Sequence, residues 1–135
     1  TLDEPTEHYY VNLSNARNSI ITDNSAQGYI QDDDGMPRLT LFSPQDTLEG
    51  DAGTQTVNFT VMLAPSSTQT VSVTYAITSG TATAGQDFTA AMSGVLRFNP
   101  GETYKVIPIS IVGDTIPETD ETIGAELSNP VNASI

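Results

Sequence analysis

The residues best placed to do chemistry are the carboxylates of the acidic loop that follows Gly113. Asp114, Glu118, Asp120 and Glu121 lie within eight residues of one another. Carboxylates crowded in this way repel each other unless a cation lies among them. Ca²⁺ takes several oxygen ligands and accepts carboxylates in flexible geometry, so this loop indicates a calcium-type site.

The acidic loop leads directly into a segment with the pattern of a strand. Ile123, Ala125 and Leu127 fall on one side of an alternating run, and Thr122 and Glu126 fall on the other. Strict alternation is typical of a half-buried β-strand. We therefore expect the carboxylates to be held at the end of a sheet.

Other chemistries have little support in the sequence. The chain has no Cys, and His8 is its one His, so thiolate sites and histidine-based zinc or catalytic sites are not indicated. Glu118 and Glu121 could in principle serve a glycosidase. That reaction needs one acid in an apolar cleft, and no aromatic cluster marks a sugar subsite. We expect a protein that is not an enzyme.

Length and charge narrow the class of partner. The chain has 135 residues, enough for one domain with a full core, and carries 17 acidic against four basic residues, a net charge of −13. Nucleic acid and anionic membranes would repel such a chain. No apolar run approaches the roughly 20 residues of a membrane span. We expect neither nucleic-acid binding nor direct membrane insertion.

The rest of the chain reads as a series of strands. No window has helical apolar spacing, and alternating runs recur with Gly- and Pro-containing turns between them, at 8–14, 26–31, from 39, 57–63, 71–78, 95–98, 107–111 and 122–128. The stretch 79–90 is expected to be a loop. This arrangement predicts an all-β fold, an antiparallel immunoglobulin-like β-sandwich of about seven strands.

The acidic loop and its strand occur twice. Placing Leu13 on Leu127 gives an offset of 127 − 13 = 114 residues, about one sandwich domain. At this offset several identities align, namely Glu4 with Glu118, Glu7 with Glu121, Asn15 with Asn129, Asn18 with Asn132 and Ile21 with Ile135. We therefore expect a piece of a tandem array.

Several short motifs, in this order, resemble the Calx-β repeat family. They are Leu48-Glu49-Gly50, Gly80-Thr81-Ala82, Gly85-Gln86-Asp87-Phe88, Phe98-Asn99-Pro100-Gly101-Glu102, Gly113-Asp114 with Glu118 and Glu121, and Leu127-Ser128-Asn129-Pro130. Family members occur in the regulatory loop of sodium–calcium exchangers, in an integrin β cytoplasmic tail, and in large bacterial and matrix surface proteins. The resemblance covers nearly the whole chain.

The resemblance implies a set of calcium ligands at the loop end of the sandwich. It carries this role onto Glu49, Asp87, Asp114, Glu118 and Glu121, and it gives the terminal acidic run of the preceding repeat as Asp32, Asp33 and Asp34. Asp51 and Asp120 are expected to be solvated neighbours. Exchanger-type sites have an acidic run where this chain has Gly113 and Thr115, which lowers the positive charge the site can hold.

The repeat also suggests how the chain is divided. Residues 1–35 are expected to be the last two strands of a preceding repeat, and residues 36–135 a Calx-β-like domain without its own closing strand. An open sheet edge favours pairing with another strand. The strand at 26–31 is a candidate donor, either within the chain or to another copy.

The function expected from these features is that of a calcium-binding structural or adhesion module in a tandem-repeat extracellular protein of bacterial origin. Its partners would be neighbouring repeats or identical subunits, with a cell-surface or matrix ligand as a further possibility. Two alternatives stay open: a calcium-sensing regulatory domain of a transporter or signalling protein, and an accessory ligand-binding domain of a secreted enzyme.

Overall fold

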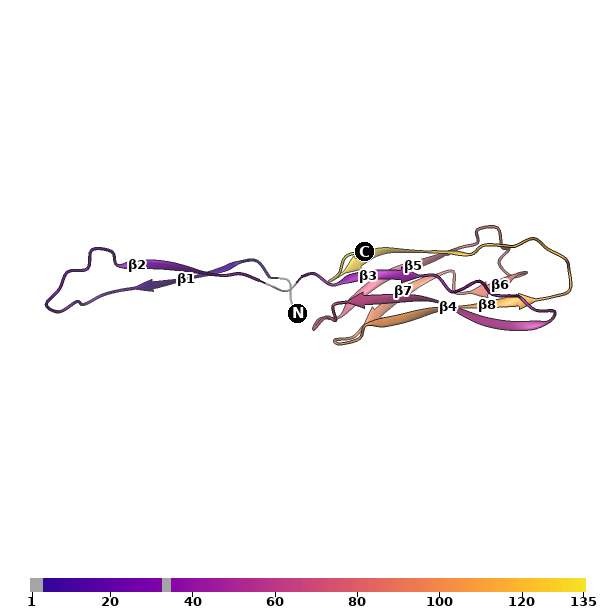
Figure 1. The fold of residues 1–135 in the computed structure, drawn as a ribbon, viewed down its shortest axis with the longest axis horizontal. Helices are drawn as coiled ribbons and strands as arrows, with labels where there is room; N and C mark the ends of the chain where they lie inside the picture. Colours follow the sequence, from indigo (N-terminus) through magenta and orange to yellow (C-terminus); the bar gives the residue numbers. More distant parts are fainter. Residues whose placement is uncertain (1–3, 33–34) are drawn as a thin grey trace. The chain divides into compact units, whose positions relative to one another are not determined.

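The computed structural model describes residues 4–32 and 35–135. The chain forms two compact units, one that ends at Gly35 and one that contains Met36–Ile135 (Figure 1). All regular elements of the described residues are strands. No helix in this part of the chain is long and apolar enough to cross a membrane.

The first unit is a β-hairpin. β1 (Glu7–Asn12) and β2 (Ser25–Ile30) pair in antiparallel register, from Glu7 opposite Ile30 to Asn12 opposite Ser25. The Tyr9 ring lies over Gly28, where a Cβ atom would collide with it. The predicted alternation is present, but the apolar side chains of both strands are exposed.

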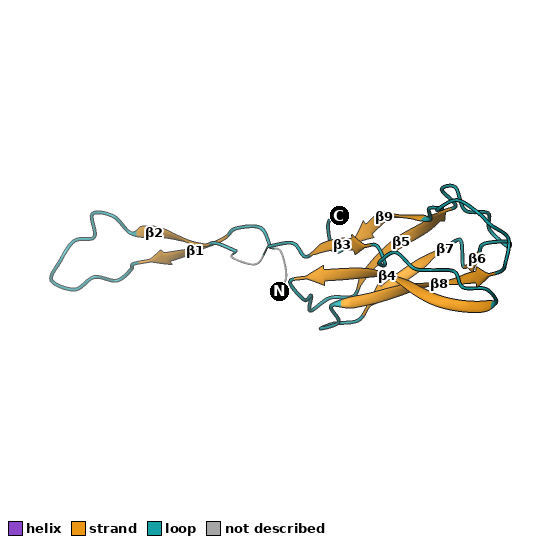
Figure 2. Ribbon diagram, turned by 45° about the vertical axis from the view of Figure 1, so that its right-hand side comes forward, coloured by secondary structure: helices purple, strands orange, loops and turns teal. Residues whose placement is uncertain are grey.

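The second unit is a sandwich of two antiparallel sheets (Figure 2). One sheet has the order β3-β4-β8-β6, with β3 Arg38–Phe42, β4 Gly53–Ala64, β8 Tyr104–Gly113 and β6 Phe88–Ala90. The other has the order β7-β5-β9, with β7 Ser93–Phe98, β5 Val71–Thr78 and β9 Gly124–Val131. The all-β sandwich predicted from the sequence is confirmed.

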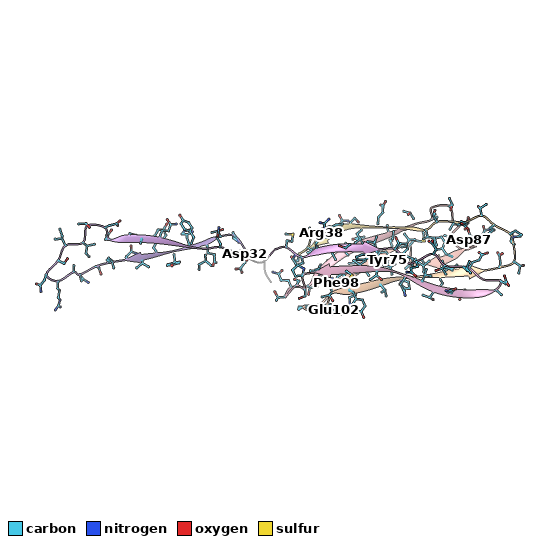
Figure 3. All side chains as sticks on the ribbon, in the orientation of Figure 1. Asp32, Arg38, Tyr75, Asp87, Phe98 and Glu102 are labelled. Atoms are coloured by element: carbon cyan, nitrogen blue, oxygen red, sulfur yellow. The ribbon has the colours of Figure 1, made fainter. Side chains whose placement is uncertain are left out.

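Alternate residues of the strands build the core. Val61, Val73 and Ile109 are completely buried, and their neighbours in sequence face outward. Phe98 and Tyr75 enter the core from the β7–β5 sheet (Figure 3). The core is therefore made from the inner faces of both sheets, as the period-two pattern predicts.

One strand was not expected from the sequence. β6 lies inside the stretch 79–90, which was expected to be a loop, and pairs with β8 from Phe88 opposite Ile111 to Ala90 opposite Ile109. Three residues are too few to show alternation, which is why the pattern missed it. Phe88 is fully buried, so β6 fixes Asp87, the residue directly before it, against the sandwich.

The sheet registers bring the acidic loops to one end of the sandwich. Gly53, at the start of β4, pairs with Gly113, at the end of β8. Thr78, at the end of β5, pairs with Gly124, at the start of β9. The loops that precede β4 and β6 and that join β8 to β9 therefore leave the sheets at this end.

Candidate metal centre

Three carboxylates converge at the loop end of the sandwich. Oxygen atoms of Asp87, Glu118 and Glu121 all lie within 4.8 Å of one another. Asp87, which is labelled in Figure 3, is half-buried, and the two glutamates are exposed. Ligand oxygens at such separations can share one cation with small adjustments of their side chains.

Asp87 is held by a tight loop before β6. The backbone N–H groups of Gln86 and Asp87 donate to the Thr83 carbonyl at 3.1 and 3.0 Å, and the Thr83 N–H donates to Asp87 Oδ2 at 2.6 Å. Gly85 has a φ of 89°, which a residue with a side chain rarely adopts. On the other side, the Val112 N–H donates to the Asp87 carbonyl at 2.9 Å. The backbone thus fixes the position of this carboxylate.

Glu121 is positioned through its neighbour Thr122. The Thr122 N–H donates to Thr81 Oγ1 at 2.8 Å, and the Thr81 N–H lies 3.2 Å from both the carbonyl oxygen and Oγ1 of Thr122. Gly80 has a φ of 57° and no room for a Cβ atom against Thr122. We call this contact the Thr81–Thr122 clamp. It ties the loop that contains Asp87 to the loop that contains Glu121.

The loop with Glu49 packs against the end of β8. A Cβ atom on Gly113 would lie 2.6 Å from the Glu49 carbonyl oxygen and 2.5 Å from that of Gly50. Gly113 is itself buried, so a larger residue there would push this loop away. The next residue, Asp114, accepts a hydrogen bond from the Ile116 N–H at 2.6 Å and so closes the turn that leaves β8. The departure from the exchanger pattern at Gly113 therefore has a packing reason.

The five carboxylates predicted at this end of the sandwich are close enough to affect one another's pKa values. The pKa of Glu118 is raised, first by partial loss of water around its carboxylate and then by the negative charges of Asp87, Asp114 and Glu49. The pKa of Glu121 is raised by the same loss of water, followed by Asp87, Glu118 and Glu49. The close approach of the Asp87 carboxylate thus raises the pKa of Glu121 through two like charges held near each other. A cation among these carboxylates would relieve the repulsion.

The remaining predicted ligands belong to the other unit or lie outside the described residues. Asp32 belongs to the hairpin unit, where its Oδ2 accepts a hydrogen bond from the Glu4 N–H at 3.0 Å. Asp33 and Asp34 lie outside the described residues. Asp51 and Asp120, expected to be solvated, are exposed.

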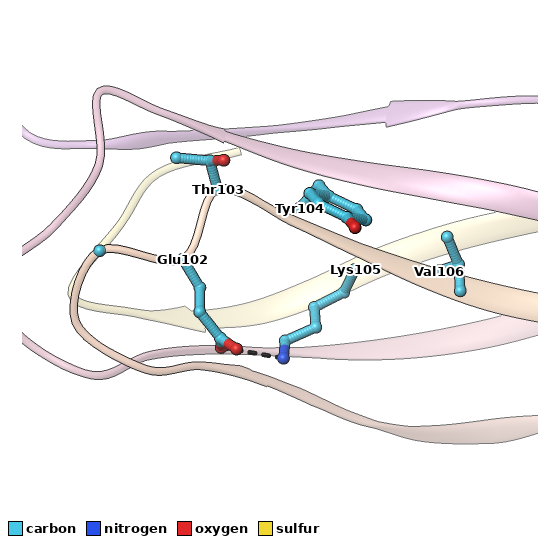
Figure 4. Close-up of a pocket in the computed structure, with 6 residues that line it drawn as sticks. Glu102, Thr103, Tyr104, Lys105 and Val106 are labelled. Carbon is cyan, nitrogen blue, oxygen red and sulfur yellow. Dashed lines mark ion pairs between the residues drawn. The ribbon is translucent and has the colours of Figure 1, made fainter.

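A different acidic residue, Glu102, lies at the opposite end of β8 and serves as a reference. Its Oε2 is 2.9 Å from Lys105 Nζ (Figure 4) and accepts the Asn99 N–H at 2.7 Å. These contacts, with Lys105 first, lower the pKa of Glu102. A positive charge and hydrogen-bond donors surround Glu102, whereas negative charges surround Glu118 and Glu121.

Sequence reasoning missed the residues that position the ligands. Thr81 lies in one of the family-like motifs, yet nothing in that motif indicated a partner 41 residues away, and Thr122 carried no signal at all. The role of Gly113 was also missed. From the sequence, Gly113 is only the absence of an acidic ligand, and its packing against the Glu49 and Gly50 backbone appears only in the structure.

The fold and the site define a class of protein, a β-sandwich module whose loop end gathers carboxylates from separate loops. Comparison with known families gives a direct match, since the sequence profile described as "Calx-beta domain" matches residues 32–134. The chain belongs to the Calx-beta family.

Individual relatives agree with this assignment. The chain is 33% identical over 96 residues to adhesion G-protein coupled receptor V1 of Danio rerio, which covers 71% of the chain and 2% of the receptor. It is 44% identical over 62 residues to sodium/calcium exchanger 1 of Canis lupus familiaris, which covers 46% of the chain and 6% of the exchanger. Among solved structures, the apo-form Calx CBD1 domain matches with a TM-score of 0.54 and 30% identity, over 59% of this chain and 70% of that one. The chain thus spans only a small part of the length of the receptor and of the exchanger.

Proposed function

We propose that this chain is a non-catalytic Ca²⁺-binding module. The observation that carries the proposal is the convergence of Asp87, Glu118 and Glu121 within 4.8 Å, in a setting that raises the pKa of both glutamates. A site built only from carboxylates suits a hard cation that takes oxygen ligands. The similarity to a sodium/calcium exchanger supports the choice of calcium.

The ligands would come from three loops and would join them. Asp87, Glu118 and Glu121 would contact the ion, and Glu49 and Asp114 would complete or balance its shell. When bound, the ion supplies positive charge that offsets the mutual repulsion of these groups. The chain's own contribution is to hold the carboxylates in place through the loop before β6 and the Thr81–Thr122 clamp. Calcium would therefore stiffen this end of the sandwich.

The context we propose is structural, with the module acting as a calcium-stiffened spacer or adhesion element in an extracellular tandem array. The repeat at an offset of 114 residues supports an array. The similarity to an adhesion receptor supports a cell-surface location. Head-to-tail assembly by strand pairing belongs to the same proposal, with neighbouring repeats or identical subunits as partners.

A regulatory calcium sensor is the second candidate, favoured by the identity of 44% to sodium/calcium exchanger 1. The two roles differ in affinity. Sensors bind calcium with dissociation constants of about 10⁻⁷–10⁻⁵ M, and extracellular modules at about 10⁻⁴–10⁻³ M. A dissociation constant below about 10⁻⁵ M would replace the structural role by the sensor role.

The test is a calcium titration by isothermal calorimetry with charge-matched variants. Glu121→Gln and Glu118→Gln each remove one charge from the site, and Glu102→Gln removes one charge from the opposite end of β8. We expect the first two variants to weaken binding and the third to bind like the wild type. Equal weakening in all three would mean that bulk charge, and not coordination, attracts the ion.

A further inference from the structure

The outer face of the sheet β3-β4-β8-β6 carries almost no charge. These four strands contain no acidic residue, although the chain has 17, and their basic residues are Arg38 and Lys105. Lys105 is already occupied by its ion pair with Glu102 at 2.9 Å. In a chain with a net charge of −13, this face is a surface that another acidic molecule can approach with little repulsion.

Large apolar side chains are exposed on this face. Opposed residues of an antiparallel pair point to the same side of the sheet, and the register places Met62 opposite Tyr104. Thr60, two residues before Met62, lies between Phe42 and Val106. The exposed fractions are 47% for Phe42, 45% for Met62, 66% for Tyr104 and 45% for Val106. Contiguous exposed apolar side chains of this kind mark an interaction surface.

The apolar patch lies on the face of the sheet and not on its edge. β4 is paired with β3 and β8, and β8 is paired with β4 and β6, so both inner strands have a neighbour on each side. A partner on this face would therefore pack side chains against side chains, as in a sandwich with about 10 Å between sheets, and would not add a strand.

The two ends of this face carry opposite charge. Arg38 points outward at one end, where it lies opposite Ala64, and within the described residues no carboxylate pairs with it. Gly53 and Gly113 are paired at the other end, where the acidic loops begin. Figure 3 shows Arg38 and Asp87 at these opposite ends of the sandwich. The face therefore has a basic end, a neutral apolar middle and an acidic end.

We propose that two copies of this chain pack the outer faces of their β3-β4-β8-β6 sheets together, about a two-fold axis that runs across the strands. Such an axis places each neutral patch on the other and brings Arg38 of each copy to the acidic end of its partner. A two-fold axis along the strands would bring the two acidic ends together, which like-charge repulsion opposes. The proposal needs neither calcium nor the strand pairing of the proposed function.

The size of the face predicts a weak dimer. Strands of 5, 12, 10 and 3 residues, at about 3.4 Å per residue and about 4.8 Å between strands, cover roughly 500 Å². Two such faces bury about 1,000 Å² in total, which is at the lower limit for a specific interface and typical of transient contacts. We therefore expect a reversible dimer that forms only at high protein concentration.

The experiment is sedimentation velocity of the full chain in chelator over a wide range of concentration, with charge-matched pairs of variants. Thr60→Glu places a carboxylate in the middle of the patch. Its control is Thr74→Glu, at an equally half-buried outward position on β5 between Val95 and Ser128, in the other sheet. Arg38→Glu reverses the charge at the basic end, and its control Arg97→Glu does so at an exposed position on β7 of the other sheet.

The wild type should show reversible dimers, and Thr60→Glu should raise their dissociation constant by about tenfold or more, because the dimer would bury two carboxylates facing each other. Thr74→Glu should change it little, and Arg38→Glu should weaken the dimer several-fold more than Arg97→Glu. Melting curves in chelator check that each variant is folded, and the arginine pair decides the result if Thr60→Glu is not.

A wild type that stays monomeric up to about millimolar concentration would overturn the proposal, as would equal effects of the two threonine variants. Equal effects of the two arginine variants would overturn the arrangement across the strands. Failure of the wild type to bind calcium would leave the dimer in chelator unchanged, so it would contradict the proposed calcium site and not this contact.

Discussion

Replacing Phe88 by Leu should separate the stability of the fold from the affinity of the metal centre. Phe88 is fully buried in β6, directly after Asp87, and the residue opposite it, Ile111, precedes the Val112 N–H that binds the Asp87 carbonyl. Phe98 is equally buried but lies at the end of β7 remote from the acidic loops, opposite Val71. Phe98→Leu is therefore a matched control.

The expected cost in stability is the same for both variants. Leu has three fewer side-chain carbon atoms than Phe, and a buried methylene is worth about 0.8 kcal/mol, so each variant should lose about 2 kcal/mol of unfolding free energy. Only Phe88→Leu loosens the short strand that fixes Asp87. We therefore expect weaker calcium binding in Phe88→Leu and unchanged binding in Phe98→Leu.

The assay combines urea denaturation in chelator with calcium titration by calorimetry. Both variants should shift the urea midpoint alike, and the calcium dissociation constant of Phe88→Leu should rise several-fold. If the two variants bind calcium equally well, β6 does not position Asp87 as described, and the geometric account of this ligand is wrong.

Three further predictions test the residues around the site. Thr81→Val removes the hydroxyl of the Thr81–Thr122 clamp and should weaken calcium binding in calorimetry, whereas Thr103→Val, at the opposite end of β8, should not. Gly113→Ala should lower both the melting temperature and calcium affinity, because its methyl group would displace the loop that contains Glu49. Raised folded-state pKa values at Glu118 and Glu121 mean that the folded protein in chelator binds protons more tightly than the unfolded chain. Their contribution to stability is therefore complete below the ordinary glutamate range and is lost as the pH rises through the raised values. Thermal melts in chelator from about pH 4 to 7 should show this loss in the wild type relative to the Glu118→Gln/Glu121→Gln double variant, which keeps the opposite contribution of Glu102. Identical pH profiles of the two proteins would contradict it.

Much of the sandwich could be predicted from the sequence because its long strands are half-buried. Val57 to Leu63 and Val71 to Ile77 alternate over enough residues to show the period of two. β6 could not be predicted, because three residues carry no period and its burial depends on pairing with β8. Periodicity in the sequence predicts long strands, whereas the formation of a short strand depends on its tertiary contacts.

The ligands of the candidate site could be predicted from the sequence, whereas the residues that position them could not. Carboxylates that repel each other within one loop are visible in the sequence, and the family-like motifs added Glu49 and Asp87 from distant loops. The groups that hold them were not visible, because Thr81 and Thr122 are ordinary polar residues until the fold places them in contact. The role of Asp32 as a ligand stays a prediction, since Asp32 belongs to the hairpin unit and not to the sandwich.

The most direct test of calcium binding is thermal denaturation of the full chain in calcium and in chelator. A ligand that binds only the folded state at a hundredfold excess over its dissociation constant stabilises that state by about 2.7 kcal/mol. For a domain of this size, each kcal/mol shifts the melting temperature by several degrees, so the total increase should be on the order of 10 °C. Identical melting curves in calcium, at concentrations well above the millimolar range of extracellular modules, and in chelator would contradict the proposed function.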